Sequence, residues 1–232
     1  MALLPGNAEV IVRPPHPRAG RIPLLLSIVL ALAYVLTGCA GTSSRAADLA
    51  TSGSESSGLH AATLNPPIEK PELTLTDTSG RPFDLRARTK GTLTLLFFGY
   101  THCPDECPTT MANIAIALKQ LAPVRARTSV VFVTTDPARD TPPVLKSWLA
   151  HYPGAGFIGL TGALKTIYAA ADTVGVPLQR PYRASDGTYV VNHGTQVLAF
   201  GLDGKAHAVF TSETSSEDYA HDLPLLLQGV SP

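Results

Sequence analysis

A nearly continuous apolar run, Thr92–Tyr100 (TLTLLFFGY), constrains the fold of this 232-residue chain more than any other segment. A run this apolar and this rich in β-forming residues is typical of a strand buried on both faces of a sheet. The apolar spacing within Pro108–Leu121 predicts a helix, and a second buried strand is predicted at Thr128–Thr134. Two buried strands joined by a helix predict a parallel pair with a right-handed crossover.

Further elements are predicted on both sides of this unit. Glu72–Thr76 and Pro82–Leu85 flank a Ser-Gly turn and predict an N-terminal β-hairpin. Downstream, we expect helices at about 142–151, 162–174 and 216–227, and strands near 189–200 and 206–211 that are joined by a tight turn. A βαβ half followed by a ββα half predicts an α/β protein with a thioredoxin-like fold over residues 66–232, in which helices flank a central mixed sheet.

The N-terminus has the features of an export signal. Three arginines precede the apolar run Ile22–Leu36, which ends in Leu-Thr-Gly before Cys39. The run has about 15 residues, whereas a spanning helix needs about 20, so a cleaved signal over residues 1–38 is favoured over an uncleaved signal anchor. The tripeptide resembles a bacterial lipobox, which implies cleavage before Cys39 and a lipid on its sulfur. We therefore expect a chain anchored by lipid to the cell membrane, on the extracytoplasmic side.

Residues 39–65 are mostly small and polar, with few large apolar side chains. Such a segment cannot bury enough surface to offset the entropy cost of ordering, so we expect a flexible tether. The whole chain has 18 Lys and Arg against 18 Asp and Glu, and no basic stripe is visible. We therefore expect no nucleic-acid partner.

Besides Cys39, the chain has one cysteine pair, Cys103 and Cys107, placed where the first buried strand ends and a helix begins. Functional sites in α/β proteins lie at such strand ends, and a helix N-terminus favours the thiolate form of a cysteine. Three residues separate the pair, one more than in the C-x-x-C motif of thiol–disulfide exchange. The pair can close a disulfide, purely structural or redox-active, or it can bind a soft cation.

Two thiolates and one imidazole form a donor set that suits copper. His102 is next to Cys103, but strand alternation predicts that it points away from the pair. His193 precedes Gly194 in a predicted β segment, where it is either presented at the end of the sheet or solvated at the surface. The other histidines are predicted to lie in the signal, in the tether or on solvated surfaces: His16, His60, His151, His207 and His221.

Four segments resemble, in order, the motifs of the Sco/SenC family across about residues 65–228: YTHCPDECP (100–108), VFVTTDPARDTP (131–142), GLTG (159–162) and VNH (191–193). The resemblance implies a membrane-tethered, thioredoxin-fold copper chaperone that helps to assemble the Cu(A) centre of cytochrome c oxidase. Its partner would be subunit II of that oxidase or another copper acceptor, and its cargo Cu(I) or Cu(II). The family's copper ligands match Cys103, Cys107 and His193. Where family members commonly have Asp, this chain has Asn192, which removes a charge that can orient the imidazole.

Copper delivery is ligand exchange, in which no substrate bond is made or broken. The alternative is a thiol–disulfide oxidoreductase that uses Cys103 and Cys107 to keep the cysteines of an acceptor reduced for metallation. A peroxidase-like activity would need an arginine beside an activated cysteine, and no arginine is near the pair in sequence.

The acidic residues around the motifs have structural interpretations as well. Thr141 or Asp140 is expected to cap the helix that begins at Pro142. Asp136 belongs to the same capping loop or, alternatively, lies in the outer shell of the metal site. Asp105 is interpreted as a carboxylate at a helix start, because oxygen suits copper less well than thiolate does.

Overall fold

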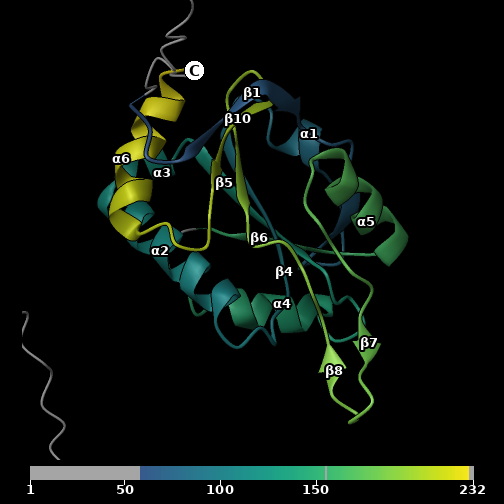
Figure 1. The fold of residues 1–232 in the computed structure, drawn as a ribbon. Helices are drawn as coiled ribbons and strands as arrows, with labels where there is room; N and C mark the ends of the chain where they lie inside the picture. The colour runs from purple at the N-terminus through teal and green to yellow at the C-terminus, as the bar shows by residue number, and fades with distance from the viewer. Residues whose placement is uncertain (1–57, 155, 230–232) are drawn as a thin grey trace, which may run out of the picture. The chain divides into compact units, whose positions relative to one another are not determined.

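The computed structural model describes residues 58–154 and 156–229, and their central element is an eight-stranded mixed sheet (Figure 1). The strand order is β1-β10-β9-β4-β5-β6-β2-β3. The strands of this sheet are β1 (Ala62–Glu69), β2 (Thr74–Asp77), β3 (Pro82–Asp84), β4 (Leu93–Gly99), β5 (Thr128–Thr134), β6 (Ile158–Thr161), β9 (Val197–Phe200) and β10 (Lys205–Phe210). The helices are α1 (Leu85–Arg88), α2 (Glu106–Gln120), α3 (Ala122–Arg125), α4 (Pro142–Leu149), α5 (Leu164–Thr173) and α6 (Ser216–Leu227).

β4 is the predicted central strand, and every one of its residues is buried. It pairs in parallel with β5 and antiparallel with β9. The β4-α2-β5 unit and the β9-β10-α6 unit are the βαβ and ββα halves of the predicted thioredoxin-like fold. The predicted N-terminal hairpin is also confirmed, because β2 and β3 pair antiparallel beside β6.

Helices cover both faces of the sheet, and each face has its own apolar core. Residues of α2, α4 and α6 pack on one face, with Met111, Leu145 and Leu223 fully buried. Residues of α5 and α1 pack on the other face, with Ile167 and Leu85 fully buried. The strands between the two layers are therefore apolar on both sides, as the run Thr92–Tyr100 predicts.

The structure corrects two predicted boundaries and adds one hairpin. The strand predicted near residues 189–200 is two strands, β8 (Tyr189–Val190) and β9, because residues 191–196 between them form an irregular connection with one isolated bridge, at His193. β8 pairs instead with β7 (Tyr182–Arg183) in a separate two-stranded hairpin that sequence reasoning missed. The helix predicted from Pro108 begins earlier, at Glu106, so that Cys107 lies in its first turn.

The tether was predicted to extend to residue 65, but β1 begins at Ala62 and pairs with β10. Apolar contacts explain the earlier start, because Ala61 is buried in one core and Leu64 packs against the other. The predicted signal segment, Cys39 and residues 40–57 lie outside the described residues. Among residues 58–154 and 156–229, no helix has both the length and the apolar character needed to cross a membrane.

Candidate metal centre

The two cysteines lie at the junction between β4 and α2, as predicted. Both are free thiols; Cys107 is fully buried in the first turn of α2, and Cys103 is half-buried in the preceding loop. The backbone N–H of Cys107 donates to the sulfur of Cys103 at 3.4 Å. The helix start therefore offers a donor to the more accessible sulfur, which favours its thiolate form.

The two sulfurs have opposite shifts in pKa. A hydrogen bond from the Cys107 thiol lowers the pKa of Cys103 to about 3, against the opposing effect of burial. The pKa of Cys107 is raised far above its usual range, because its thiol is the donor in that bond and is also buried. Before metal binds, the pair consequently holds one proton on the inner sulfur and one negative charge on the outer sulfur.

Gly99, the last residue of β4, makes room for the inner sulfur. A Cβ atom at this position would lie 2.7 Å from the Cys107 sulfur and 2.8 Å from the Phe132 ring. Both distances are too short for non-bonded atoms, so no residue larger than glycine fits without a shift. Sequence reasoning did not single out Gly99, although a glycine that ends an apolar run is a signal for close packing.

His193 completes a cluster of three donor side chains. One donor atom each from Cys103, Cys107 and His193 lies within 4.8 Å of the others, and Nε2 of His193 is 3.5 Å from the Cys107 sulfur. The imidazole makes edge-on ring contacts with Phe97 and Tyr100, at centroid distances of 6.1 and 5.4 Å. The structure thus brings the three predicted ligands together from two separate segments of the chain.

A backbone carbonyl orients the imidazole of His193. Its Nδ1 is 2.8 Å from the carbonyl oxygen of Gly194, and an oxygen acceptor there places the proton on Nδ1. The lone pair of the neutral ring is then on Nε2, the atom that faces the sulfur. The amide of Asn192 donates instead to the side-chain oxygen of Gln179 at 2.8 Å. In this chain the Gly194 carbonyl therefore orients His193, without a charged side chain at position 192.

Two thiolates and one imidazole suit copper, because soft sulfur selects Cu(I) and imidazole accepts both oxidation states. The sequence profile of SCO1/SenC proteins matches residues 61–228, which is most of the chain and includes all three donor residues. The chain belongs to the SCO1/SenC family.

Individual relatives agree with this assignment. A protein of Stutzerimonas stutzeri whose name refers to copper binding is 37% identical over 158 residues, which cover 68% of this chain and 76% of the relative. The structure of Bradyrhizobium japonicum ScoI with copper bound is similar, with a TM-score of 0.61 and 31% identity over 69% of this chain and 99% of that one. The solution structures of apo Sco1 from Thermus thermophilus give a TM-score of 0.64 with 29% identity, over 73% of this chain and 97% of that one.

The prediction that the side chain of Asp140 or Thr141 caps α4 is wrong for this SCO1/SenC protein. Neither Asp140 nor Thr141 makes a side-chain cap, since the N-cap position of α4 is Thr141 and lacks that hydrogen bond. The fully buried carboxylate of Asp140 accepts three hydrogen bonds instead: from the backbone N–H of Thr101 at 2.9 Å, from the Thr101 hydroxyl at 2.6 Å and from the Thr134 hydroxyl at 2.6 Å. Asp140 therefore fastens the cysteine loop to the end of β5.

Asp136 is also fully buried, and it connects β5 to the β7–β8 hairpin. Its carboxylate pairs with Arg139 and accepts a hydrogen bond from the Tyr189 hydroxyl at 3.1 Å. The guanidinium of Arg139 lies over the ring of Tyr189, at 4.4 Å, and faces that of Tyr100 at 6.0 Å. An arginine thus lies near the site in space, but its charge is paired with Asp136. Asp105 precedes α2 as predicted, although its side chain makes no cap hydrogen bond.

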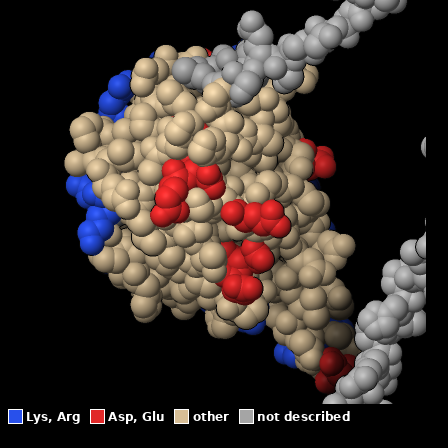
Figure 2. Space-filling model, turned by 60° about the vertical axis from the view of Figure 1, so that its left-hand side comes forward, with Lys and Arg blue, Asp and Glu red and all other residues tan. Residues whose placement is uncertain are grey.

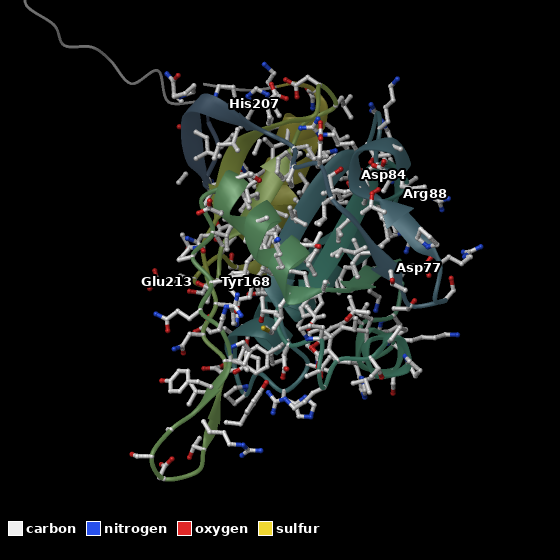
Figure 3. The ribbon with its side chains drawn as sticks, turned by 90° about the vertical axis from the view of Figure 1, so that its right-hand side faces the viewer. Asp77, Asp84, Arg88, Tyr168, His207 and Glu213 are labelled. Carbon is white, nitrogen blue, oxygen red and sulfur yellow. The ribbon has the colours of Figure 1, made fainter. Side chains whose placement is uncertain are left out.

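The remaining predictions concern the other histidines. His102 hydrogen-bonds through Nδ1 to the Thr101 hydroxyl at 3.0 Å and is not part of the three-residue cluster, as predicted. His151 contacts the carbonyl of Trp148, and His207 pairs with Asp203. In Figures 1 and 3 the β7–β8 hairpin projects from the body of the protein, just before the segment that carries His193.

Proposed function

We propose that this protein is a membrane-tethered copper chaperone that delivers copper to the Cu(A) site of cytochrome c oxidase, through subunit II or another acceptor. The observation that carries the proposal is the convergence of Cys103, Cys107 and His193 at one strand end. Family membership supports the same assignment, since copper is present in the ScoI structure of Bradyrhizobium japonicum. Copper is the cargo of the protein, so the chemistry required is binding and release.

The geometry of the site supports transfer by ligand exchange. Cys107 is fully buried, whereas Cys103 is half-buried and His193 is partly exposed. Soft ligands of an acceptor can therefore approach the metal from the side of Cys103 and His193. Thiolates of the acceptor replace those of the chaperone without any net oxidation or reduction, because metal–ligand bonds are exchanged one for one.

A second candidate function uses the same cysteines for thiol–disulfide exchange. The specific observation in its favour is the division of the pair into an accessible Cys103 with a low pKa and a buried Cys107 that keeps its proton. An attacking thiolate and a protected resolving thiol are what a disulfide reductase needs. Such an activity would keep the cysteines of the copper acceptor reduced.

His193→Ala separates the two functions, because copper needs a third ligand and thiol exchange does not. We expect the variant to lose most of its Cu(I) affinity while the Cys103–Cys107 disulfide keeps a similar reduction potential. The decisive measurement is oxidase assembly at low copper in cells that carry the variant. Failure as severe as that of a double cysteine variant supports delivery; assembly at the wild-type level assigns the physiological role to the reductase.

The membrane tether is part of the proposal and rests on the sequence. Leu-Thr-Gly before Cys39 and the short apolar run support cleavage at this cysteine and its lipidation. We expect Cys39→Ala to leave the precursor uncut, whereas the wild-type protein in the membrane fraction starts at a lipid-modified Cys39. Mass spectrometry of both proteins checks this, and an intact Met1 in the wild-type membrane fraction contradicts it.

A further inference from the structure

Charged side chains are unevenly distributed over the described part of the protein. Figure 2 shows the side on which α6 lies: acidic side chains gather near the middle of this face, and basic ones lie toward its edges. Glu217 and Asp218, in the first turn of α6, are two of the acidic residues of this helix. The positive charge therefore belongs to other parts of the surface, which the direction of the strands identifies.

Four basic residues come together at the edge of the sheet where β4 and β5 begin. Arg88 and Lys90 belong to the segment that leads into β4, and Arg125 and Arg127 belong to the segment that leads into β5. The N–H of Leu93 donates to the carbonyl of Arg127 at 3.0 Å, so the two segments lie side by side. All four basic residues are exposed, and we call them the basic edge. It was not visible in the sequence, because it combines two distant segments.

The charges of the basic edge have no acidic partner within the part of the chain that the structure describes, since none of its ion pairs includes these four residues. Arg125 donates to the carbonyl of Gly154 at 3.0 Å, and Arg88 lies over the ring of Phe83 at 5.5 Å. Both contacts leave the positive charge in place. The acidic residues around the basic edge are engaged elsewhere: Glu72 with Arg86, Glu69 with Lys205, Asp203 with His207, and Asp84 as the cap of α1.

The basic edge and the metal site lie at opposite ends of the same strand. Cys103 and Cys107 follow the end of β4, whereas the basic edge precedes its start. β4 has seven residues, so about 20 Å of strand separates the two ends. In Figure 3 Arg88 lies toward the end of the molecule opposite the projecting β7–β8 hairpin. A surface that contacts the basic edge therefore leaves the metal site and the hairpin uncovered.

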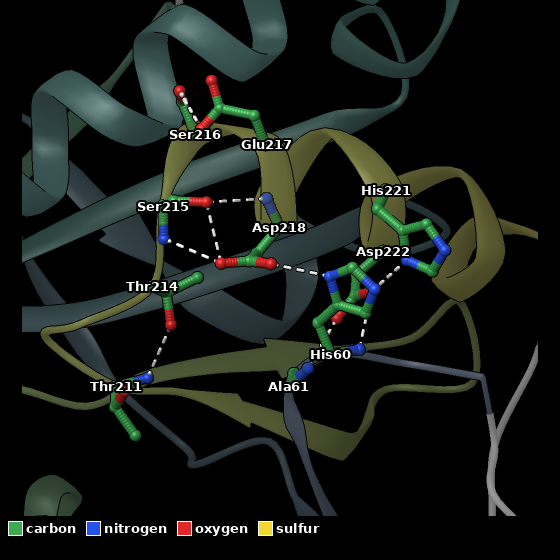
Figure 4. Close-up of polar contacts among 10 residues, drawn as sticks. All are labelled: His60, Ala61, Thr211, Thr214, Ser215, Ser216, Glu217, Asp218, His221 and Asp222. Atoms are coloured by element: carbon green, nitrogen blue, oxygen red, sulfur yellow. Dashed lines mark hydrogen bonds and ion pairs between the residues drawn. The ribbon is translucent and has the colours of Figure 1, made fainter.

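The chain enters its folded part on α6 (Figure 4). Asp222 is fully buried and accepts the backbone N–H groups of His60 at 3.0 Å and Ala61 at 2.7 Å, while Nδ1 of His60 is 2.6 Å from Asp218. His60 was predicted to lie in the tether, and these contacts correct that prediction. The chain from Cys39 to His60 can reach across at most about 70 Å when fully extended. A domain of this size has a radius of gyration of only about 16 Å, so an anchor at Cys39 does not decide which end of the domain faces the membrane.

We propose that the basic edge binds anionic lipid headgroups of the membrane to which the chain is tethered, so that the metal site faces away from that membrane. The inference rests on the lipid anchor of the proposed function. Lipid phosphates are complementary to guanidinium and ammonium groups, and each Lys or Arg close to an anionic surface strengthens binding about fivefold. The tether keeps the domain at a high effective concentration near the lipid, so a patch of four cations is sufficient to orient it. Cys103 and His193 are then presented to an acceptor that extends from the same membrane.

The test uses the chain from Cys39 onward with Cys103→Ser and Cys107→Ser, which retains residues 58–229 and the two cores they form. Coupling Cys39 to a maleimide lipid attaches this protein to vesicles, and acetylation by an amine-reactive ester is mapped by mass spectrometry. In vesicles that contain phosphatidylglycerol, Lys90 should react at least about fivefold more slowly than in vesicles of phosphatidylcholine alone, the factor that one cation near an anionic surface contributes. Lys146, which lies on α4, should react equally in both, and high salt should abolish the protection of Lys90.

Removal of charge gives a matched comparison. Arg88→Gln together with Arg127→Gln should weaken binding of the uncoupled protein to phosphatidylglycerol vesicles about 25-fold, about fivefold for each residue, as measured by co-sedimentation. The control, Arg180→Gln with Arg183→Gln, removes the same charge beside the β7–β8 hairpin and should leave binding unchanged. Equal acetylation of Lys90 in both kinds of vesicle, or equal loss of binding in the two double variants, overturns the proposal. These outcomes depend neither on lipidation in cells, because the attachment is chemical, nor on copper delivery, because the two thiols of the metal site are absent.

Discussion

The cysteine half of the metal site (Cys103 and Cys107) and its histidine half (His193) lie on backbone segments that the rest of the fold holds very differently. Cys107 follows β4, which is buried throughout and hydrogen-bonded on one side to β5 and on the other to β9. His193 lies between β8 and β9, where an isolated bridge to Leu178 and a hydrogen bond from the Gly194 N–H to the Pro177 carbonyl hold the backbone. The first support belongs to the core of the fold, and the second is a short irregular connection beside a projecting hairpin.

The difference teaches how a protein can hold a metal and still release it. Segments with few buried contacts open more readily than a central strand. The sulfurs are thus preorganised, whereas the imidazole is the ligand with the least backbone support. We expect all three ligands to contribute to the affinity of the site, and His193 to be the ligand that detaches first when copper leaves.

The largest expected effect concerns the cysteine half. Cys107→Ser or Cys103→Ser should abolish tight Cu(I) binding, because the hydroxyl is a hard donor that does not replace thiolate. Competition with a chromophoric Cu(I) chelator measures the loss, which should exceed the 10–100-fold that removal of an outer-shell partner costs. If a variant without both cysteines held copper with unchanged spectra, the assignment of the site would be wrong.

Next in size is the pH dependence of cysteine reactivity. Because the pKa of Cys103 is lowered to about 3, its thiolate persists as pH falls and is lost only near that value. An ordinary cysteine, with a pKa of about 8.5, would be mostly protonated at pH 6. Alkylation of the reduced protein should therefore be nearly constant from pH 5 to 8 and confined to Cys103.

The same measurement on His193→Ala sharpens the comparison between the two halves. Since the hydrogen bond from Cys107 is the main cause of the low pKa of Cys103 and does not involve His193, the pH profile of alkylation should move only slightly. An alkylation rate that rises about tenfold per pH unit from pH 5 to 8, as for an unperturbed thiol, would show that the cysteine half is not preorganised.

A smaller effect is expected from Gly99→Ala, which places a Cβ against the Cys107 sulfur and the Phe132 ring. Overpacking of this kind costs about 1–3 kcal/mol of unfolding free energy. Gly159→Ala is the matched control: it lies on β6, two strands from β4, and its Cβ would lie 2.7 Å from Leu149, with Thr78 and Leu145 as its other nearest contacts and no metal ligand among the three. Denaturant unfolding should show similar losses for both, and only Gly99→Ala should weaken copper binding.

The smallest effect concerns position 192 in the histidine half. The amide of Asn192 bonds to Gln179, and the carbonyl of Gly194 orients His193, so Asn192→Ala should change stability by less than about 0.5 kcal/mol. Copper affinity should stay within about twofold, as measured by the same chelator competition. A loss of 10-fold or more would show that the residue before His193 orients the imidazole after all.

Strong periodic patterns made much of the fold predictable. β5 and α6 have the predicted bounds, because uninterrupted apolar runs and helical spacing report burial directly. β1 was missed because Pro66 and Pro67 interrupt it, and its place in the sheet depends on β10, far away in the sequence. The β7–β8 hairpin was missed because its strands have two residues each and are not buried.

The ligands of the site could be predicted from the sequence, whereas the residues that hold the ligands in place could not. A cysteine pair at a strand end has a local signature, and the resemblance supplied His193. The role of Asp140 was not predictable, since it depends on Thr101 and Thr134, which approach it only in the folded chain. His60 was assigned to the tether for the same reason, because its partner Asp218 comes from α6.

The two outermost strands of the eight-stranded sheet have a consequence for self-association. β1 contains two consecutive prolines and a register shift against β10, while β3 has three residues and begins with Pro82. Proline lacks the N–H that an added strand would bind, and short or irregular borders give little template for pairing. Neither border of the sheet is therefore suited to polymerisation through backbone hydrogen bonds, and molecules of this protein can be crowded together without joining their sheets.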